Sequence, residues 1–164
     1  RHQYKEGMMD QVDRVLYDLK NNPYSRRIMT NIYVHQDLHE MNLYPCAYSM
    51  TFNVTGNKLN AILNQRSNDI LTANNWNVVQ YAVLVHMIAQ VSGLEAGELV
   101  HVIADAHIYD RHIPLVKELI KRQTYDAPVF RMNPDVKDFY EFTVDDFELE
   151  DYMYGPQIKI PVAV

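Results

Sequence analysis

The chain has 164 residues, 48% of them hydrophobic and 22% charged, which is enough for one globular domain with its own core. Its formal net charge of -6 argues against nucleic acid as the main partner, because backbone binding requires a broad basic surface. No apolar run has the length of a bilayer span, and the opening residues lack the apolar segment of a signal peptide. We therefore expect a cytoplasmic protein that binds neither nucleic acid nor membrane.

The first half of the chain predicts a helix, a strand and a hairpin. Residues 8–20 carry apolar side chains at spacings of three and four, which is typical of a helix with one apolar face, and Pro23 follows its end. Residues 28–34 have strand composition, and a loop or short turn follows. Between residues 48 and 63 apolar residues alternate with polar or small ones around Gly56-Asn57, which indicates a β-hairpin.

The second half predicts one long buried helix among shorter elements. An unbroken apolar pattern marks this helix at residues 77–91, and Gly93 is its expected C-terminal cap. The other expected elements are a strand at 99–104, a turn at 105–109, a helix at 111–122, a strand at 129–132, a turn at 133–134 and an acidic segment at 145–152 that leads to an apolar tail. The fold class is mixed α/β (α+β), with strands of both directions. Because the chain opens at Arg1 without capping or strand signals, we expect it to be the C-terminal part of a longer product.

The only cysteine, Cys46, precedes the segment Gln65-Arg66-Ser67-Asn68-Asp69 by about twenty positions. The predicted hairpin places Cys46 at the start of one strand and Arg66 at the end of the other, so both should lie at the same edge of the sheet. A thiolate needs nearby positive charge to become a nucleophile at neutral pH, and Arg66 could supply it. The alternative for a lone cysteine is an inert, buried small side chain.

Ordered segments along nearly the whole chain resemble thymidylate synthase. They are Ser25-Arg26-Arg27, Pro45-Cys46, Gln65 to Asp69, Asn77 with the long helix, His86 to Gln90, Asp105 to Tyr109, Asn133-Pro134, Phe147 to Glu150 and Pro161 to Val164. The resemblance implies a thymidylate synthase-type fold with a mixed twisted sheet, a long buried helix and a sheet-mediated homodimer. It also implies that residues 1–164 form a single domain and that a preceding part of the family's chain is absent, with its proton-relaying glutamate and its folate-lining tryptophans.

The implied reaction is the reductive methylation of dUMP to dTMP. The co-substrate 5,10-methylenetetrahydrofolate would give the one-carbon unit and the hydride, leaving dihydrofolate, while the Cys46 thiolate adds to C6 of dUMP. Cys46 and Asn77 are the implied catalytic residues. Two alternatives remain open at this point: a dUMP hydroxymethylase of the same fold, and a nucleotide-binding, dimerising remnant without turnover.

The resemblance also assigns ligands residue by residue. Arg66 and Ser67 would bind the phosphate together with Arg26 and Arg27 of the partner in a homodimer, although adjacent arginines are otherwise typical of a solvated surface. Asn77 would read O4 and N3 of uracil, with an N-cap of the long helix as its structural alternative. The remaining implied dUMP ligands are Gln65, Asp69, His107 and Tyr109, and the implied folate ligands are Asp69, Ala163 and Val164.

The sequence also departs from the family pattern. Ala47 stands where a histidine is usual, and Ala73 and Ala104 stand where glycines are common; an alanine at positive φ would cost about 1 kcal/mol. Trp76 and Asn74-Asn75 are further changes, on the folate side. No metal site is expected, because the histidine pairs 35/39 and 107/112 lack a set of carboxylate or thiol ligands.

Overall fold

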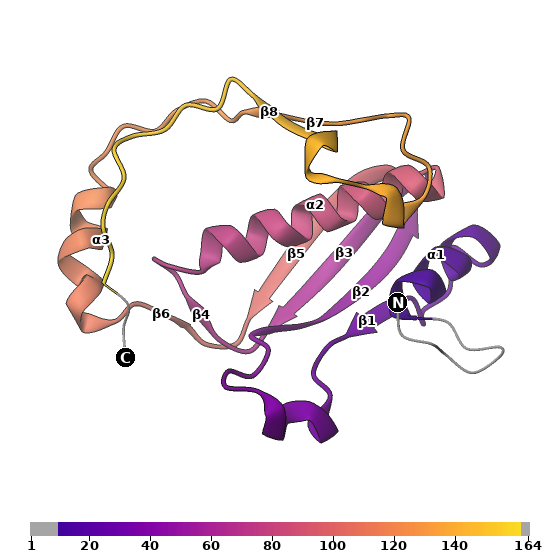
Figure 1. Cartoon of the computed structure of the whole chain (residues 1–164), viewed down its shortest axis with the longest axis horizontal. Helices are drawn as coiled ribbons and strands as arrows, with labels where there is room; N and C mark the ends of the chain where they lie inside the picture. The colour runs from indigo at the N-terminus through magenta and orange to yellow at the C-terminus, as the bar shows by residue number, and fades with distance from the viewer. Residues whose placement is uncertain (1–9, 162–164) are drawn as a thin grey trace.

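A four-stranded mixed sheet forms the centre of the computed structural model, which describes residues 10–161. The strand order is β1 (Met29–Asn31), β2 (Ala47–Thr55), β3 (Lys58–Gln65) and β5 (Glu95–Ile103). The first three strands pair antiparallel, whereas β3 and β5 run parallel (Figure 1). The prediction of a mixed α/β fold with strands of both directions is therefore confirmed.

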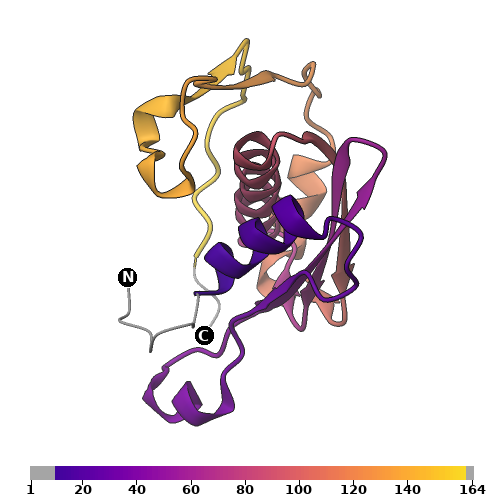
Figure 2. The ribbon, with the colours of Figure 1, turned by 90° about the vertical axis from the view of Figure 1, so that its right-hand side faces the viewer.

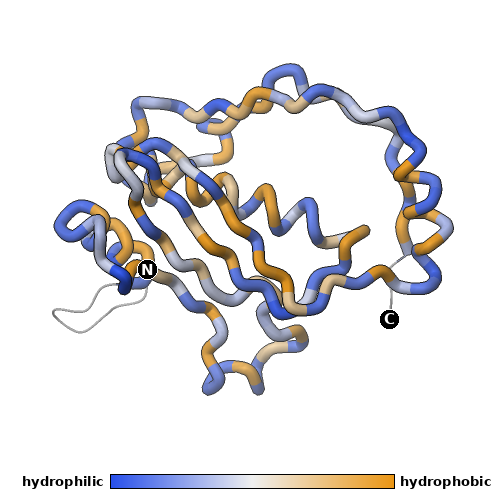
Figure 3. The backbone as a smooth tube through the Cα atoms, turned by 180° about the vertical axis from the view of Figure 1, so that it is seen from behind, coloured by the Kyte–Doolittle hydropathy of each residue, from blue (hydrophilic) through white to orange (hydrophobic). Residues whose placement is uncertain are grey.

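Two helices, α1 (Gln11–Asn21) and α2 (Asn74–Ser92), cover one face of this sheet (Figure 2). The side chain of Asp10 caps α1 by accepting the backbone N–H of Asp13, and Gly93 ends α2 in the left-handed conformation at φ 71°. The core lies between these helices and the sheet, and its largest fully buried apolar side chains are Val15, Ile28, Met50, Phe52, Leu59, Leu63 and Ile88. Seen from behind, the opposite face of the sheet stands in front of α2 with no described helix over it (Figure 3).

The predicted hairpin is present, with β2 and β3 in antiparallel register from Thr55 opposite Lys58 to Ala47 opposite Gln65. Its turn contains Gly56 at φ 62°, a conformation that glycine adopts without a steric penalty. Alternate residues of β3 point into the core. The hairpin therefore brings the start of β2, next to Cys46, and the end of β3, next to Arg66, to the same edge of the sheet.

Several shorter elements differ from the prediction. Residues 35–40 form a 3-10 helix (His35–Glu40), and two-residue strands β4 (Asn68–Asp69) and β6 (Ala106–His107) pair in parallel. The helix expected at 111–122 is shorter: η2 (Asp110–His112) leads into α3 (Ile113–Leu119), after which Lys121 and Arg122 donate to carbonyls three residues back. This tightening of the last turn ends the α-helix early.

The acidic segment near the C-terminal end contains a strand that the composition did not indicate. Phe147–Glu150 forms β8, which pairs antiparallel with β7 (Val129–Met132). Glutamates at alternate positions mask the strand pattern, because this two-stranded ribbon buries none of its side chains fully and leaves half of them exposed. The ribbon reaches α2 through Phe130, whose ring packs edge-on against His86 at a centroid distance of 5.2 Å.

The two alanines at common glycine positions carry no backbone strain. Ala73 has φ -114°, and Asp151, at φ 57°, is the one non-glycine residue between 10 and 161 with positive φ. Neither Ala73 nor Ala104 therefore pays the energy that alanine would cost at positive φ. Among the same residues, no helix combines the length and the hydropathy needed to cross a membrane.

Candidate active site

The candidate residues gather where the parallel strands β3 and β5 end. The segments that follow these strands run side by side, since Ala104 N–H donates to the Gln65 carbonyl at 2.9 Å and Asn68 N–H donates to the Asp105 carbonyl at 2.8 Å. The start of β2 joins them, because Arg66 N–H donates to the Cys46 carbonyl at 2.9 Å. Segments that are far apart in the sequence thereby form one edge of the molecule (Figure 1).

The thiol of Cys46 is half-buried and lies beside the Arg66 guanidinium. Arg66 Nη2 is 3.9 Å from Cys46 Sγ, so the predicted proximity of these residues is confirmed. The same guanidinium also supports the chain on which the thiol lies: its Nε donates to the Pro45 carbonyl at 3.0 Å and its Nη2 donates to the Tyr44 carbonyl at 2.8 Å. Arg66 therefore places positive charge at the thiol and fixes the segment that leads to it.

A buried amide connects this edge to the start of α2. Gln65 is 2% exposed, and its Nε2 donates to Asn77 Oδ1 at 2.9 Å. Asn77 lies in the first turn of α2 and donates its backbone N–H to the carbonyl of Ala73, which is the N-cap residue. The alternative role of Asn77 as the helix cap is therefore wrong, and its side chain faces the Gln65 edge instead.

Asp69 is held as an ionised carboxylate by its own turn. Its Oδ1 accepts the backbone N–H of Leu71 at 3.0 Å, and its Oδ2 accepts the Thr72 hydroxyl at 2.5 Å. Burial by itself raises the pKa of Asp69, but the hydrogen bonds from Thr72 and Leu71, with a smaller contribution from His112, outweigh it and leave the pKa lowered. A group with fixed negative charge thus lies next to His107, its register partner across β4 and β6.

The side chains of His107 and Tyr109, two of the implied nucleotide ligands, lie together. Their rings pack edge-to-face at a centroid distance of 5.2 Å, and His107 Nδ1 lies 3.1 Å from Asp105 Oδ1. A donor and a hydroxyl are therefore presented side by side at the end of β6. This pairing suits recognition of a sugar hydroxyl.

Two predicted residues do not join this cluster within one chain. Arg26 and Arg27 line a surface hollow after α1, together with Asn22, Tyr24 and Ser25. The Ile28 carbonyl that follows accepts Phe52 N–H, and the extended chain from Cys46 to Phe52 covers about 20 Å. The other two predicted residues, Ala163 and Val164, lie outside the described residues.

Sequence reasoning assigned no site role to three polar residues of this region, namely Asn68, His101 and His112. Asn68 is 1% exposed, and its Nδ2 donates to Asn74 Oδ1 at 2.9 Å. His101 lies 2.8 Å from Gln65 through its Nε2, and the alternation of β5 could have revealed it as a polar residue on the face that Leu99 and Ile103 share. His112 is fully buried, and no pattern in the sequence indicates this.

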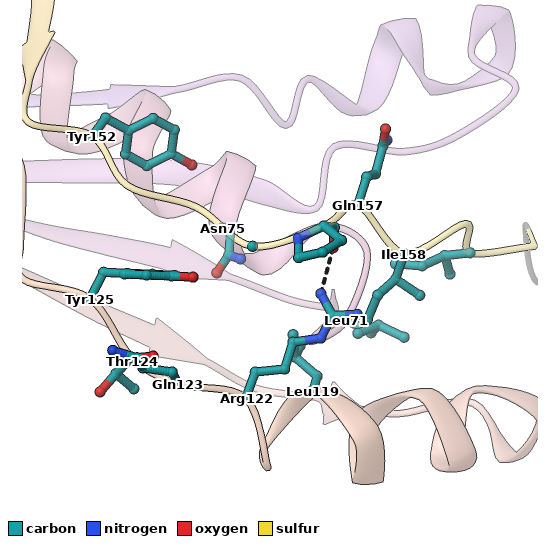
Figure 4. Close-up of a pocket in the computed structure, with 13 residues that line it drawn as sticks. Leu71, Asn75, Leu119, Arg122, Gln123, Thr124, Tyr125, Tyr152, Gln157 and Ile158 are labelled. Atoms are coloured by element: carbon teal, nitrogen blue, oxygen red, sulfur yellow. Dashed lines mark hydrogen bonds between the residues drawn. The ribbon is translucent and has the colours of Figure 1, made fainter.

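The C-terminal segment is fastened to the stretch that contains η2 and α3. The ring of His112 is bonded through Nε2 to the Pro161 carbonyl at 2.8 Å, and Arg122 donates to the Pro156 carbonyl at 2.5 Å. Between these anchors lies a cavity of about 790 Å³, bordered by Leu71 and Asn75 on one side and by Tyr125 and Tyr152 on another (Figure 4). The cavity adjoins the Asp69 turn at Leu71 but shares no lining residue with the Cys46 cluster.

No group of three or more histidine, cysteine, aspartate or glutamate side chains within residues 10–161 is arranged to hold a metal ion. The polar groups at this edge include the Cys46 thiol, the Arg66 guanidinium, the Gln65 and Asn77 amides, the His101 and His107 imidazoles and the carboxylates of Asp69 and Asp105. These groups are suited to a thiol nucleophile that acts on a ligand with a polar ring and an anionic group.

Comparisons with known proteins agree with this geometry. The model of the family described as thymidylate synthase matches residues 1–164. Thymidylate synthases of Bacillus subtilis subsp. natto and Bacillus licheniformis are each 47% identical to this chain over 156 residues, covering 95% of the chain and 56% of the relative.

A solved structure, thermostable thymidylate synthase A from Bacillus subtilis, matches with a TM-score of 0.93 and 44% identity. The match covers 99% of this chain and 59% of that one, so the chain spans little more than half the length of these relatives. A family model that covers the whole chain, together with this identity and structural likeness, establishes the relationship. The chain belongs to the thymidylate synthase family.

Proposed function

We propose that this chain supplies the thiol and most of the nucleotide site for the reductive methylation of dUMP to dTMP, with 5,10-methylenetetrahydrofolate as co-substrate. The observation that carries the proposal is the placement of Cys46 beside Arg66. The adjacent residues, Ala47 and Gln65, are paired across β2 and β3, and the Gln65 side chain donates to Asn77. A nucleophile, a cation and a base-reading amide are thus neighbours at one edge. The names of the relatives support the same reaction.

The proposed chemistry begins with addition of the Cys46 thiolate to C6 of dUMP. The new C–S bond moves an electron pair toward O4 and C5, so that C5 becomes nucleophilic and attacks the one-carbon unit of the folate. Loss of the C5 proton breaks the bond between the one-carbon unit and the folate nitrogen. Hydride transfer from the released tetrahydrofolate to that carbon then expels the Cys46 thiolate, which gives dTMP and dihydrofolate. In this scheme Asn77 donates to O4 and accepts from N3–H, which favours uracil over cytosine.

Arg66 and Ser67 are the proposed phosphate ligands, with His107 and Tyr109 at the 3′-hydroxyl. Arg66 Nη1 makes no hydrogen bond to a described residue, and Arg66 also lines a hollow of about 350 Å³ formed with Asn31, Tyr33, His35 and Tyr48. This opening gives an anion access to the guanidinium. The proposed folate contacts are Asp69, whose ionised carboxylate can accept pterin N–H groups, and the terminal residues Ala163 and Val164.

We further propose that the active form is a homodimer in which Arg26 and Arg27 bind the phosphate in the partner's site. Within one chain these arginines lie at the opposite end of β2 from Cys46, so only a second copy could bring them to the thiol edge. The uncovered face of the sheet supports this arrangement, because its outward side chains include Ile62, Val100 and Val102, which are 37%, 49% and 47% exposed. Apolar side chains at this exposure are suited to burial against an identical face.

The first test is the denatured mass of the protein after incubation with 5-fluoro-dUMP and 5,10-methylenetetrahydrofolate. Fluorine at C5 cannot leave as a proton does, so the covalent complex should accumulate. We expect a mass gain equal to the nucleotide plus the folate, and no gain in Cys46→Ala. Absence of a gain, with dUMP still raising the thermal midpoint, would contradict the proposed turnover and leave nucleotide binding. With dUMP itself, release of dTMP rather than the 5-hydroxymethyl product distinguishes methylation from hydroxymethylation.

A further inference from the structure

His101 has no assigned role, yet it contacts the amide pair that would read the pyrimidine. It lies on β5 between Val100 and Val102, and its side chain takes the inward direction while theirs point outward. Its Nε2 lies 2.8 Å from Gln65 Oε1. His101 is therefore linked to Asn77 through one intervening side chain.

The orientation of the Gln65 amide follows from a backbone group. Gln65 Nε2 lies 2.8 Å from the Ser67 carbonyl, which can only accept a hydrogen bond. The nitrogen of the amide must face that carbonyl, because the reverse orientation would bring two oxygens into contact. Oε1 consequently faces His101, and the ring must present Nε2–H to it.

The orientation of Asn77 follows in turn from that of Gln65. The second hydrogen of Gln65 Nε2 is directed at Asn77 Oδ1 at 2.9 Å, so Asn77 cannot flip without placing two N–H donors against each other. A carboxamide in this orientation offers an oxygen to N3–H and a nitrogen to O4, which matches uracil. The flipped carboxamide would match N3 and the amino group of cytosine instead.

We infer that His101 is a positioning residue for base selectivity: by donating Nε2–H to Gln65 Oε1, it holds the Gln65 and Asn77 amides in the orientation that accepts uracil and disfavours cytosine. The inference rests on the proposed function, because it concerns the same nucleotide site. Gln65 is 2% exposed, so loss of the histidine leaves Oε1 without a partner in a place with little access to water. The Gln65 amide is then held through its Nε2 and no longer through its Oε1. Burial also lowers the pKa of His101, which keeps the ring neutral near pH 7, where its tautomer matters.

The test compares the wild-type protein with His101→Phe and His101→Gln. Phenylalanine keeps a ring and removes the donor, whereas the Nε2 of glutamine occupies a similar place and restores it. His86→Phe is the matched control, because His86 is an exposed histidine of α2 that packs against Phe130 of the β7–β8 ribbon rather than against the amide pair. Dissociation constants for dUMP and dCMP are measured by calorimetry in all four proteins.

We expect the ratio of the dCMP to the dUMP dissociation constant to fall on the order of tenfold in His101→Phe, the effect of one unpaired buried acceptor. The ratio should recover in His101→Gln and stay unchanged in His86→Phe. If His101 had a purely structural role, its loss would weaken the binding of dUMP and of dCMP equally. An unchanged ratio of the two dissociation constants in His101→Phe would therefore overturn the inference.

Nitrogen chemical shifts of the His101 ring give a readout that does not depend on nucleotide binding. The Nε2–H tautomer is expected, together with a shift of the Asn77 side-chain NH₂ signals in His101→Phe. The Nδ1–H tautomer in the wild-type protein would exclude the donor role. If the wild-type protein binds no dUMP, the proposed function fails, and the tautomer and the Asn77 signals still decide whether His101 holds the amides.

Discussion

Arg66 positions Cys46 in two ways: its Nη2 lies 3.9 Å from the thiol sulfur, and its Nε and Nη2 donate to the carbonyls of Pro45 and Tyr44, the two residues before the cysteine. The contact joins the end of β3 to the start of β2. A planar guanidinium can make these contacts together, whereas an ammonium group cannot reproduce their fixed geometry. Arg66 therefore contributes fixed geometry as well as charge at this position.

The first prediction concerns Arg66→Lys. The substitution keeps the charge but loses the two carbonyl contacts, so the Tyr44–Cys46 segment should become less fixed. We expect the rate of Cys46 adduct formation with 5-fluoro-dUMP and the folate to fall at least about tenfold, the size expected when a charge-assisted contact is lost. Mass spectrometry over time measures the rate.

Arg131→Lys is the control for this change, because Arg131 forms an exposed ion pair with Glu150 on the distant β7–β8 ribbon. Its rate should equal that of the wild-type protein. An Arg66→Lys rate equal to that of the control would show that the guanidinium geometry does not matter.

A second prediction concerns Gly97 in β5. A Cβ built there would lie 2.3 Å from Asn60 Oδ1 and 2.9 Å from the Leu59 carbonyl, and the backbone carbonyl cannot move aside cheaply. Gly97→Ala should therefore lower the free energy of unfolding by about 1–3 kcal/mol, the usual cost of overpacking. Urea denaturation followed by circular dichroism measures the change.

Gly155→Ala is the matched control, since the nearest atom to its Cβ is Arg122 Nη1 at 3.8 Å. Its unfolding free energy should change little. Adding Asn60→Ala to Gly97→Ala removes the closest contact and should recover part of the loss. Equal stability of the two glycine variants would contradict the close approach of β3 and β5.

The third prediction is a pH dependence of stability from His86. Burial lowers the pKa of this histidine in the folded protein, so between the folded and the unfolded pKa the unfolded chain binds more protons. The stability that neutral His86 contributes to the folded state is therefore fully present above the pKa of the unfolded chain, about 6.5. It is lost as the pH falls toward the lower pKa of the folded protein. The free energy of unfolding should decrease from pH 7.5 to pH 5.5.

His86→Gln removes the titrating group, so the slope between these two pH values should be smaller in this variant than in the wild-type protein. Urea denaturation at both pH values gives the slopes. Because His101 shares the lowered pKa, the slope should shrink without disappearing. A slope unchanged by the substitution would exclude His86 as its source.

A fourth prediction tests the proposed homodimer. Val102→Lys places a charge on the uncovered face of the sheet, next to Ile62 and Val100. Burying an unpaired ammonium against a second copy is costly, so the variant should be monomeric at concentrations where the wild-type protein is dimeric. Sedimentation velocity measures the association state.

Val144→Lys is the control, because Val144 is 83% exposed and lies outside this face. It should associate as the wild-type protein does. A dimer of Val102→Lys as stable as the control would place the interface elsewhere and would remove the structural argument for shared arginines.

The sequence alone predicted the elements whose patterns are local. The alternation around Gly56 predicted the hairpin and with it the meeting of Cys46 and Arg66, because strand period and turn chemistry depend on adjacent residues. The long helix was predicted for the same reason. Ordered motifs, rather than any single one, predicted the family.

Tertiary structure alone decided what depends on contacts between distant segments. The strand β8 exists because β7 lies beside it, and His101 acquires a partner because β5 lies parallel to β3. The buried state of His112 arises likewise from the return of the C-terminal segment to Pro161. Such hydrogen bonds and burial are set by segments far away in the chain, so no local pattern of residues encodes them.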